Sequence, residues 1–292
     1  CALPACLALS LAWAGACGAQ SPDNYPVRPV QVVIPFPTGG VTDIEARMFM
    51  AKLAESMGRP FVLDFKPGAG STLDANDELK ALATLTKLDK LGFSLHFLTN
   101  VNVKDKGLQQ FANLTQLREL RFTMTQVKGE GLAPFVNAEK LDVSYTPIND
   151  AGLASVAGMR KLRTLGLRDT FVTDEGLRHL SGLKTLEALD LYGLKITDRG
   201  VAQLRDLTNL RTLNLLGAQL SDESMDVLAR MTQLTELNLY RSQITNAGLA
   251  KLKGLKNLST LDLRYTRVTR NGVEDFRAAV PGVQIAFQDS GP

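Results

Sequence analysis

The sequence predicts an α/β solenoid, in which every coil contributes one short strand of a parallel sheet and one helical return. Three observations lead to this prediction. A 24-residue repeat runs through the C-terminal two thirds of the chain, each repeat holds two leucines spaced two apart, and a three-spaced run of leucines follows them. Leu165 and Leu167, for example, recur as Leu189 and Leu191 in the next repeat.

The spacing of the leucines explains the two parts of each coil. Residues two apart in an extended segment point to the same side, so Leu165 and Leu167 indicate a strand with one buried face. Leu177, Leu180 and Leu183 then recur every third residue, which favours an α-helical or 3₁₀ return with one apolar edge. One coil cannot bury these leucines alone, whereas stacked coils share a core. The period therefore predicts a leucine-rich-repeat solenoid.

The turn before each return carries helix-start signals. Thr173 offers a side-chain oxygen to free backbone amides, and the carboxylate of Asp174 suits the positive end of a helix. The same turn recurs every 24 residues except for one step of 21, where Pro134 predicts an irregular return. The apolar residues that open these turns are Val103, Val127, Ile148, Val172, Ile196, Leu220, Ile244 and Val268.

Both ends of such a stack expose apolar edges and need a cap. Ile285 and Phe287 stand 24 positions after Leu261 and Leu263, which predicts a last strand at the C-terminal end. The segment 91–98 fits the repeat poorly and predicts a distorted first coil. We expect the repeat domain to span residues 79–292. A three-spaced run at its start is either the cap or the return of a lost repeat, and consists of Leu79, Leu82, Leu85, Leu88 and Leu91.

The first 19 residues form an apolar run that ends in small residues and is short for a bilayer span. It has the pattern of a secretory signal whose start is incomplete, and we expect cleavage after Ala19. A buried helix is the alternative interpretation. Lipid attachment at Cys17 is a further alternative, although Ala14 stands three positions earlier where a lipoprotein signal favours Leu.

Composition excludes several classes of function. The chain has 292 residues, 22% of them charged, and a net charge of +3, which does not indicate a nucleic-acid or acidic-membrane partner. The three cysteines all lie within the first 17 residues, so the chain after Ala19 has no thiol for catalysis or metal binding. His96 and His179 are the two histidines and are far apart in the predicted stack. We therefore expect no enzyme, no cofactor and no metal site.

Residues 20–71 have a different pattern, that of a strand, a helix and a second strand. The run from Val30 to Phe36 is dense in β-branched residues, a helical pattern extends from Thr42 or Asp43 to Gly58, and 61–65 is again apolar. Glycine loops follow both strands. In an open α/β unit such loops lie near a helix N-terminus, where free amides favour an anion.

This segment resembles the start of the Bug family, the periplasmic receptors of tripartite tricarboxylate transporters. The resemblance covers about 47 residues, and beyond Ser71 the chain has no counterpart of the later strands, the hinge or the second lobe. Residues 72–78 are then a junction. The resemblance implies export, and a pocket for a small carboxylate formed by Gly39, Gly40, Asp43, Gly68, Ala69 and Gly70. It rests on Tyr25-Pro26, Arg28-Pro29, Pro35-Phe36, Gly39-Gly40, Asp43, Ala46-Arg47 and Pro67-Gly68-Ala69-Gly70.

The repeats, with the pattern L-x-x-L-x-L-x-x-T-x-V-T-D-x-G-L, resemble bacterial relatives of the ribonuclease-inhibitor-like leucine-rich repeats. Many such families carry a ladder of Asn or Thr after the strand. Thr146, Thr170 and Thr266 occupy that position here, whereas other coils carry Leu194, Ala218 and Ser242.

Side chains that flank the strand leucines should line the concave face of the solenoid. One column holds Arg121, Asp142, Gly166, Asp190, Asn214, Asn238 and Asp262. A second holds Ser144, Arg168, Tyr192, Leu216, Tyr240 and Arg264, and beside it stand Tyr145, Asp169, Arg241 and Tyr265. Tyr and Arg favour protein interfaces. The predicted binding residues are Arg168, Asp190, Tyr192, Asn214, Asn238, Tyr240, Arg241, Arg264 and Tyr265.

A second interpretation of these columns needs no partner. Strand positions favour Tyr and Thr in general, and Asp or Asn in register can simply solvate a sheet. The residues do not decide between the two. Our leading hypothesis is an exported protein that binds a protein or peptide on the concave face without catalysis. The alternatives are a periplasmic carboxylate receptor that uses residues 25–71, and a fusion that retains neither activity.

Overall fold

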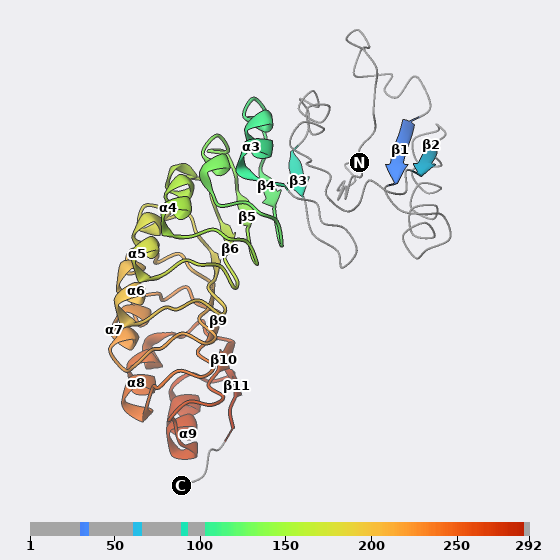
Figure 1. The fold of residues 1–292 in the computed structure, drawn as a ribbon. Coiled ribbons are helices and arrows are strands. Elements are labelled where there is room, and N and C mark those ends of the chain that lie inside the picture. The colour runs from blue at the N-terminus through green and yellow to red at the C-terminus, as the bar shows by residue number, and fades with distance from the viewer. Residues whose placement is uncertain (1–29, 35–60, 66–88, 93–102, 289–292) are drawn as a thin grey trace.

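The computed structural model describes residues 30–34, 61–65, 89–92 and 103–288. Within the repeat domain it shows one parallel sheet whose nine strands follow one another in sequence order (Figure 1). This confirms the α/β leucine-rich-repeat solenoid. The strands are β3 Lys90–Gly92, β4 Glu119–Arg121, β5 Lys140–Asp142, β6 Thr164–Gly166, β7 Ala188–Asp190, β8 Thr212–Asn214, β9 Glu236–Asn238, β10 Thr260–Asp262 and β11 Gln284–Ala286.

From β3 to β10 the central residue of each strand is a leucine, which lies opposite the central residue of the next strand. Leu165, for example, pairs with Leu141 on one side and Leu189 on the other. From β4 to β10 these leucines are buried and belong to one continuous core. A slip of one residue would bring all of them to the surface, so burial of the leucines determines the register of the sheet.

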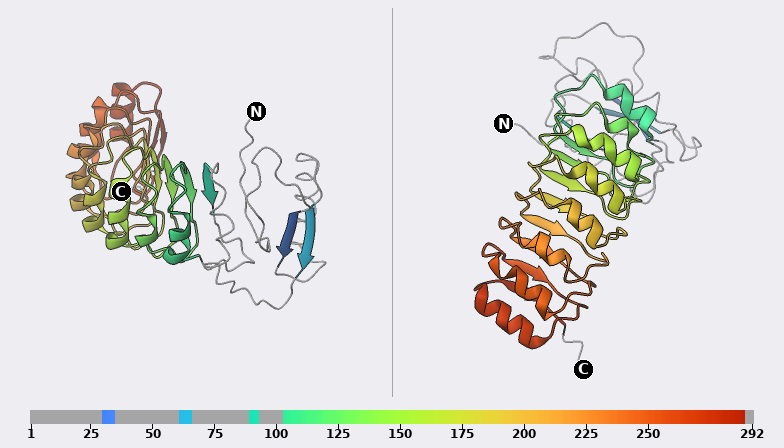
Figure 2. Two further views of the ribbon diagram at one scale, coloured as in Figure 1. Left: turned by 90° about the horizontal axis from the view of Figure 1, so that it is seen from above. Right: turned by 90° about the vertical axis from the view of Figure 1, so that its left-hand side faces the viewer.

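The returns lie on the opposite side of the stack from the strands (Figures 1 and 2). The α-helices are α3 Asp105–Leu108, α4 Asp150–Leu153, α5 Asp174–Leu177, α6 Asp198–Gln203, α7 Ser224–Leu228, α8 Asn246–Lys251 and α9 Arg270–Ala279. The 3₁₀ turns are η3 Gln109–Phe111, η4 Glu130–Leu132, η5 Ala154–Gly158, η6 Arg178–Leu180 and η7 Leu252–Gly254. The return that contains Pro134 holds η4 and no α-helix, as its proline predicts.

Hydrogen bonds between coils join the starts of the returns. Thr173 donates from its backbone nitrogen and its Oγ1 to the carboxylate of Asp150, each at 2.7 Å, and its Oγ1 accepts from the amide of Glu175. The helix start predicted at Thr173 is thereby confirmed, and the preceding coil holds the capping hydroxyl in place. Asp174 accepts the same two hydrogen bonds from Thr197, and Asp222 accepts them from Thr245.

In three returns these aspartates leave room only for a glycine, namely Gly176, Gly200 and Gly248. A Cβ at Gly176 would overlap Oδ1 of Asp150, and a Cβ at Gly248 would overlap Oδ1 of Asp222. Ser224 occupies the corresponding position of another coil, and there the hydroxyl donates a hydrogen bond to Asp198. The repeat therefore allows either no side chain here or one that binds the aspartate.

The described ends of the stack agree with the sequence in part. β11 pairs with β10 through Ile285 and Leu261, which confirms the last strand. Leu91, however, lies in β3 and pairs with Leu120. It therefore belongs to a strand and not to the cap or return that the three-spaced run predicted. Leu91 and Leu120 are 29 positions apart, whereas most paired residues of neighbouring strands are 24 apart. The first coil is therefore longer, which agrees with the distortion predicted for it.

The predicted threonine ladder does not connect coils. Thr146, Thr170 and Thr266 donate their hydroxyl hydrogens to the carbonyl three residues earlier in the same coil, at 2.6, 2.9 and 2.7 Å. Thr125, which the sequence pattern did not single out, does the same. Oγ of Ser242 is buried and makes no hydrogen bond with the described residues. The threonines thus close the turns after β4, β5, β6 and β10.

The N-terminal part of the chain is described only in two strands. β1 Val30–Ile34 and β2 Phe61–Phe65 pair in parallel, as a strand, helix and strand unit requires. The predicted signal, the helix after Thr42 and both glycine loops lie outside the described residues, and so do His96 and residues 72–78. Within the described ranges no helix has the length and apolar character needed to cross a bilayer.

Candidate protein-binding face

The strand face forms an open trough of about 870 Å³. Its floor in the middle of the stack consists of small residues that project little from the sheet, namely Thr164, Gly166, Ala188 and Thr212. Longer polar side chains stand at the edge where the strands end. The trough extends along β4 to β10, so a bound chain would cross several coils.

The first column of the trough, at the last residue of each strand, stabilises the turns. Oδ1 of Asp190 accepts a hydrogen bond from the amide of Tyr192 at 3.1 Å, and Asn214 and Asn238 accept equivalent bonds at 3.2 and 3.0 Å. Nδ2 of Asn214 also donates to Asp190 at 3.0 Å. These predicted site residues therefore have a structural role, whatever they bind.

Gly166 has no side chain that could accept a hydrogen bond from the turn, so a residue of another coil accepts it. The amide of Arg168, which would otherwise bind an Asp or Asn, donates to Oγ of Ser144 in the preceding coil at 3.2 Å. Asp142 already occupies the space above Gly166, because a Cβ there would lie 2.7 Å from its Oδ1.

The second column brings arginine and tyrosine together. Nε of Arg168 binds Asp190 at 2.5 Å, and its guanidinium lies 5.8 Å from the ring centre of Tyr192. The hydrogen bond to Asp190 raises the pKa of Arg168, although desolvation opposes it. Arg264 forms a forked contact with Asp262, and its pKa is raised by that hydrogen bond. Both arginines are held as cations with fixed orientation.

A compact cluster closes the C-terminal end of this face. The rings of Tyr240 and Tyr265 meet edge to face with centres 5.0 Å apart. The guanidinium of Arg241 lies 5.5 Å from the first ring centre and 5.9 Å from the second. Among the described residues no carboxylate pairs with Arg241, and 53% of Tyr265 is exposed. The cluster offers aromatic area and one cation.

A third column has an unusual backbone. We call it the turn column, and all its members have positive φ, between 46° and 86°. Left-handed backbone is uncommon for residues other than glycine and rare for bulky ones. The amide of each member up to Arg241 donates to a carbonyl of the next coil, which keeps the column in line. It consists of Met124, Tyr145, Asp169, Gly193, Gly217, Arg241 and Tyr265.

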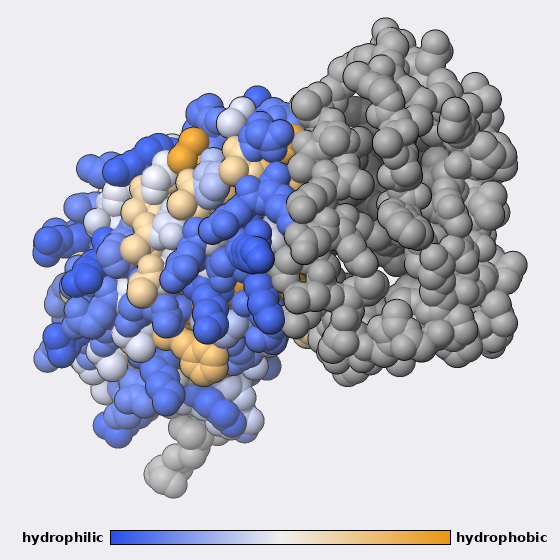
Figure 3. All heavy atoms as spheres, turned by 45° about the horizontal axis from the view of Figure 1, so that its top comes forward, coloured by the Kyte–Doolittle hydropathy of each residue, from blue (hydrophilic) through white to orange (hydrophobic). Residues whose placement is uncertain are grey.

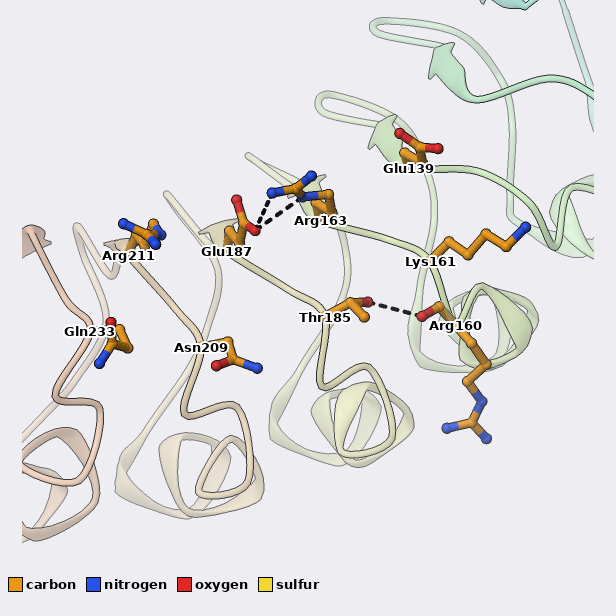
Figure 4. Close-up of a pocket in the computed structure, with 9 residues that line it drawn as sticks. All are labelled: Glu139, Arg160, Lys161, Arg163, Thr185, Glu187, Asn209, Arg211 and Gln233. Atoms are coloured by element: carbon orange, nitrogen blue, oxygen red, sulfur yellow. Dashed lines mark hydrogen bonds and ion pairs between the residues drawn. The ribbon is translucent and has the colours of Figure 1, made fainter.

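A second hollow lies at the opposite edge, where the strands begin (Figure 4). Arg163 binds Glu187 there, and Arg160 binds the carbonyl of Gly182. Oγ1 of Thr185 donates to the carbonyl of Arg160. Neighbouring coils use these side chains to bind one another, so this hollow is a weaker candidate than the trough. The described residues that face the viewer in Figure 3 are mainly hydrophilic, with smaller apolar areas among them.

The structure brings the predicted face residues into two groups. Arg168, Asp190 and Tyr192 meet at the middle, and Tyr240, Arg241, Arg264 and Tyr265 meet at the C-terminal end. The sequence pattern missed Thr164, Ala188 and Thr212 of the floor and the two glycines of the turn column. Counting in steps of 24 from Thr164 and from Asp169 would have found their positions.

The structure does not describe the second predicted site, the pocket for a small carboxylate. The six residues that the Bug resemblance implies, Gly39, Gly40, Asp43, Gly68, Ala69 and Gly70, lie outside the described residues. No group of His, Cys, Asp and Glu side chains suited to a metal ion occurs within the described ranges. His179 lies in η6 on the return side, far from the trough, as the repeat period predicts.

Comparison with known proteins supports the two resemblances separately. A family model described as a leucine-rich repeat matches residues 139–157. Over a partial N-terminal region the chain is similar to Bug proteins. Protein BugT of Bordetella pertussis is 38% identical over 81 residues, which are 28% of this chain and 25% of BugT. A UPF0065 protein of a Pseudomonas species is 40% identical over 63 residues, 22% of this chain and 19% of that protein. The chain thus spans a quarter or less of these relatives.

Solved structures match the repeat fold. Internalin C2 of Listeria monocytogenes has a TM-score of 0.55 and 24% identity, over 73% of this chain and 84% of internalin C2. Internalin F of the same organism has a TM-score of 0.55 and 22% identity, over 90% of this chain and 87% of internalin F. At this identity the likeness shows the fold alone.

Proposed function

We propose that this protein binds another protein or a peptide in the trough on the strand face, and that it does so without catalysis. The observation that carries the proposal is the paired Arg and Tyr column beside a floor of small residues. Arg168 with Tyr192, and Arg264 with Tyr240, supply rigid area and directed hydrogen-bond donors. Such side chains dominate the energy of many protein interfaces.

The carboxylates of the trough favour binding over acid or base chemistry. Asp190 accepts from a backbone amide, from Asn214 and from Arg168, and Asp262 is held by Arg264. A general base must be within hydrogen-bond reach of the proton that it accepts. These carboxylates are already bound by arginine and backbone donors, so their role is to orient the cations.

Export is a separate part of the proposal. It rests on the signal pattern of residues 1–19 and on the similarity to Bug proteins. Cells that produce the protein should release it from the cytoplasm, and N-terminal sequencing of the exported chain should begin after Ala19. A lipid on Cys17 would instead give a blocked N-terminus and a membrane-associated product.

Selection from a random peptide library displayed on phage, with the full chain as the target, tests the binding proposal. Peptides that survive selection should lose affinity when Tyr192, Tyr240 and Tyr265 are all changed to Ala. The matched control changes Arg178, His179 and Arg205 on the return side to Ala. The proposal fails if no peptide is enriched, or if the control weakens binding as much as the tyrosine variant.

A carboxylate receptor is the second candidate, and one observation favours it. The N-terminal region is similar to BugT, and β1 and β2 pair in parallel as such a unit requires. Calorimetric titration of the full chain with citrate distinguishes a carboxylate receptor from a protein that binds peptides in the trough. Heat that disappears in Asp43→Ala supports the receptor, whereas a trough binder gives no heat with citrate. A fusion that retains neither activity would give neither citrate heat nor selected peptides.

A further inference from the structure

The turn column carries an ordered charge pattern that the trough itself lacks. After Met124 it presents Tyr145, Asp169, Gly193, Gly217, Arg241 and Tyr265, so that two opposite charges flank two glycines and one aromatic ring stands beyond each charge. Asp169 and Arg241 are both exposed. Neither the carboxylate of Asp169 nor the guanidinium of Arg241 has an ionic partner among the described residues.

The two charges contrast with their neighbours. Arg168 and Arg264 are already bound to Asp190 and Asp262, so they offer little free charge to a partner. The carboxylate of Asp169 instead lies over Gly193, where a Cβ would overlap its Oδ1. The guanidinium of Arg241 rests on two rings, which orient it without neutralising it. These free charges are therefore available to a ligand.

Their separation follows from the stack. Asp169 and Arg241 are three coils apart, and each coil adds one strand spacing of about 4.8 Å, which gives about 14 Å. The hydrogen bonds that link the turn column from coil to coil hold this distance. An extended peptide advances about 3.4 Å per residue, so two side chains four positions apart match it. Between the two charges, Gly217 leaves room for the peptide backbone, because only Cα of Gly193, at 4.0 Å, lies near the position of its Cβ.

We propose that the turn column binds an extended peptide segment that carries a Lys or Arg beside Asp169 and an Asp or Glu four positions away beside Arg241. The carboxylate of the peptide would receive the planar guanidinium fork of Arg241. The exposed rings of Tyr145 and Tyr265 would cover the ends of the segment. This inference rests on the proposed peptide-binding function and defines the chemistry of its partner.

For a segment that binds in one chain direction, charge complementarity also determines the order of its two charges. The basic residue must lie toward the N-terminal coils and the acidic residue toward the C-terminal coils. Reversal of the two charges should therefore reverse the order that is selected. A surface that merely solvated the sheet would select no order, because exposed single charges interact weakly with mobile partners.

The experiment compares phage-displayed random peptides selected by the full chain and by Asp169→Arg with Arg241→Asp in one variant. The expected result is a basic and an acidic residue four positions apart, in one order for the original chain and in the reverse order for the variant. The matched control exchanges an exposed pair on the return side, Asp226→Lys with Lys251→Asp, and should keep the original order. Arg241→Asp alone should weaken a selected peptide about fivefold to tenfold.

The outcomes separate this inference from the proposed function. If enriched peptides depend on Tyr192 and Tyr240 but show no charge pair, the trough binds and the inference is wrong. It is equally wrong if both proteins select one order. If no peptide is enriched over an unrelated target, the proposed function and the inference fall together.

Discussion

Asp222 and Thr245 join two neighbouring coils through a contact that recurs at the same place in other coils. The carboxylate of Asp222 accepts from the backbone nitrogen of Thr245 at 2.8 Å and from its Oγ1 at 2.6 Å. The threonine hydroxyl in turn accepts from the amide of Ala247 at the start of α8. One carboxylate thereby links the end of one turn to the helix start of the next coil.

Replacement of Asp222 by Ala should destabilise the solenoid by about 1 to 3 kcal/mol, because two partly buried donors lose their acceptor. Urea unfolding of the full chain would measure it. Asp226→Ala is the matched control, since Asp226 in the same coil forms only an exposed ion pair with Lys251 and should cost about 0 to 1 kcal/mol. Equal losses in the two variants would contradict a structural role for Asp222.

Gly248→Ala should be more damaging than the size of a methyl group suggests. The added Cβ would overlap Oδ1 of Asp222, so either the aspartate leaves Thr245 or the coils separate. We expect a loss of about 1 to 3 kcal/mol, as for overpacking. Gly254 has nothing within 4 Å of the corresponding Cβ position, and Gly254→Ala should be neutral or slightly stabilising. Similar denaturation midpoints for both variants would refute the steric explanation.

Asp198 should make stability depend on acid pH. Burial alone would raise its pKa, but hydrogen bonds from Ser224 and Ser221 outweigh burial, and the pKa is lowered from its ordinary value. A carboxyl group with a lowered folded pKa stabilises the native state above its unfolded pKa. That contribution is lost as the pH falls from the unfolded pKa through the folded one.

Ser224→Ala should therefore reduce stability near neutral pH and reduce its decline in acid. Urea midpoints measured along a pH series would show both effects. Ser181→Ala is the control, because the hydroxyl of Ser181 donates to a backbone carbonyl and contacts no carboxylate. An unchanged acid decline in Ser224→Ala would mean that other groups cause it.

The C-terminal helix should be essential to the stack. Phe276 in α9 is fully buried and covers the apolar edge of the last coils. Phe276→Ala should cost about 3 to 5 kcal/mol, measured by thermal and urea unfolding. Phe171 is 70% exposed, and Phe171→Ala should change stability by about 0.5 kcal/mol or less. A small loss at Phe276 would show that α9 does not cap the core.

Arg241→Gly should separate binding from stability. Its φ of 63° suits glycine, so relief of the left-handed backbone roughly offsets the added freedom of the unfolded chain. We expect a stability change of about 1 kcal/mol or less, together with weaker binding of the selected peptides. Arg264→Gly should lower stability instead, because it breaks the fork with Asp262 without relieving any positive φ.

How far the sequence predicted the site depends on the kind of contact. The place of Tyr240 and Arg264 on neighbouring coils follows from the 24-residue step alone. The stacking of Arg241 on the rings of Tyr240 and Tyr265 does not, because the repeat gives the face of each side chain but not its conformation. The positive φ of Tyr145 and Tyr265 was equally hidden, since glycine is the usual sign of such a backbone and these coils lack it.

The sequence by itself determined the strand positions, the parallel order of the coils and the irregular return at Pro134. Leucine spacing suffices for these, because burial of one face permits one register. Tertiary structure alone decided which aspartate meets which threonine, why Gly176 cannot carry a side chain, and why Leu91 belongs to a strand. Those facts depend on the distance between atoms of different coils, and stacking sets that distance only after the coils have come together.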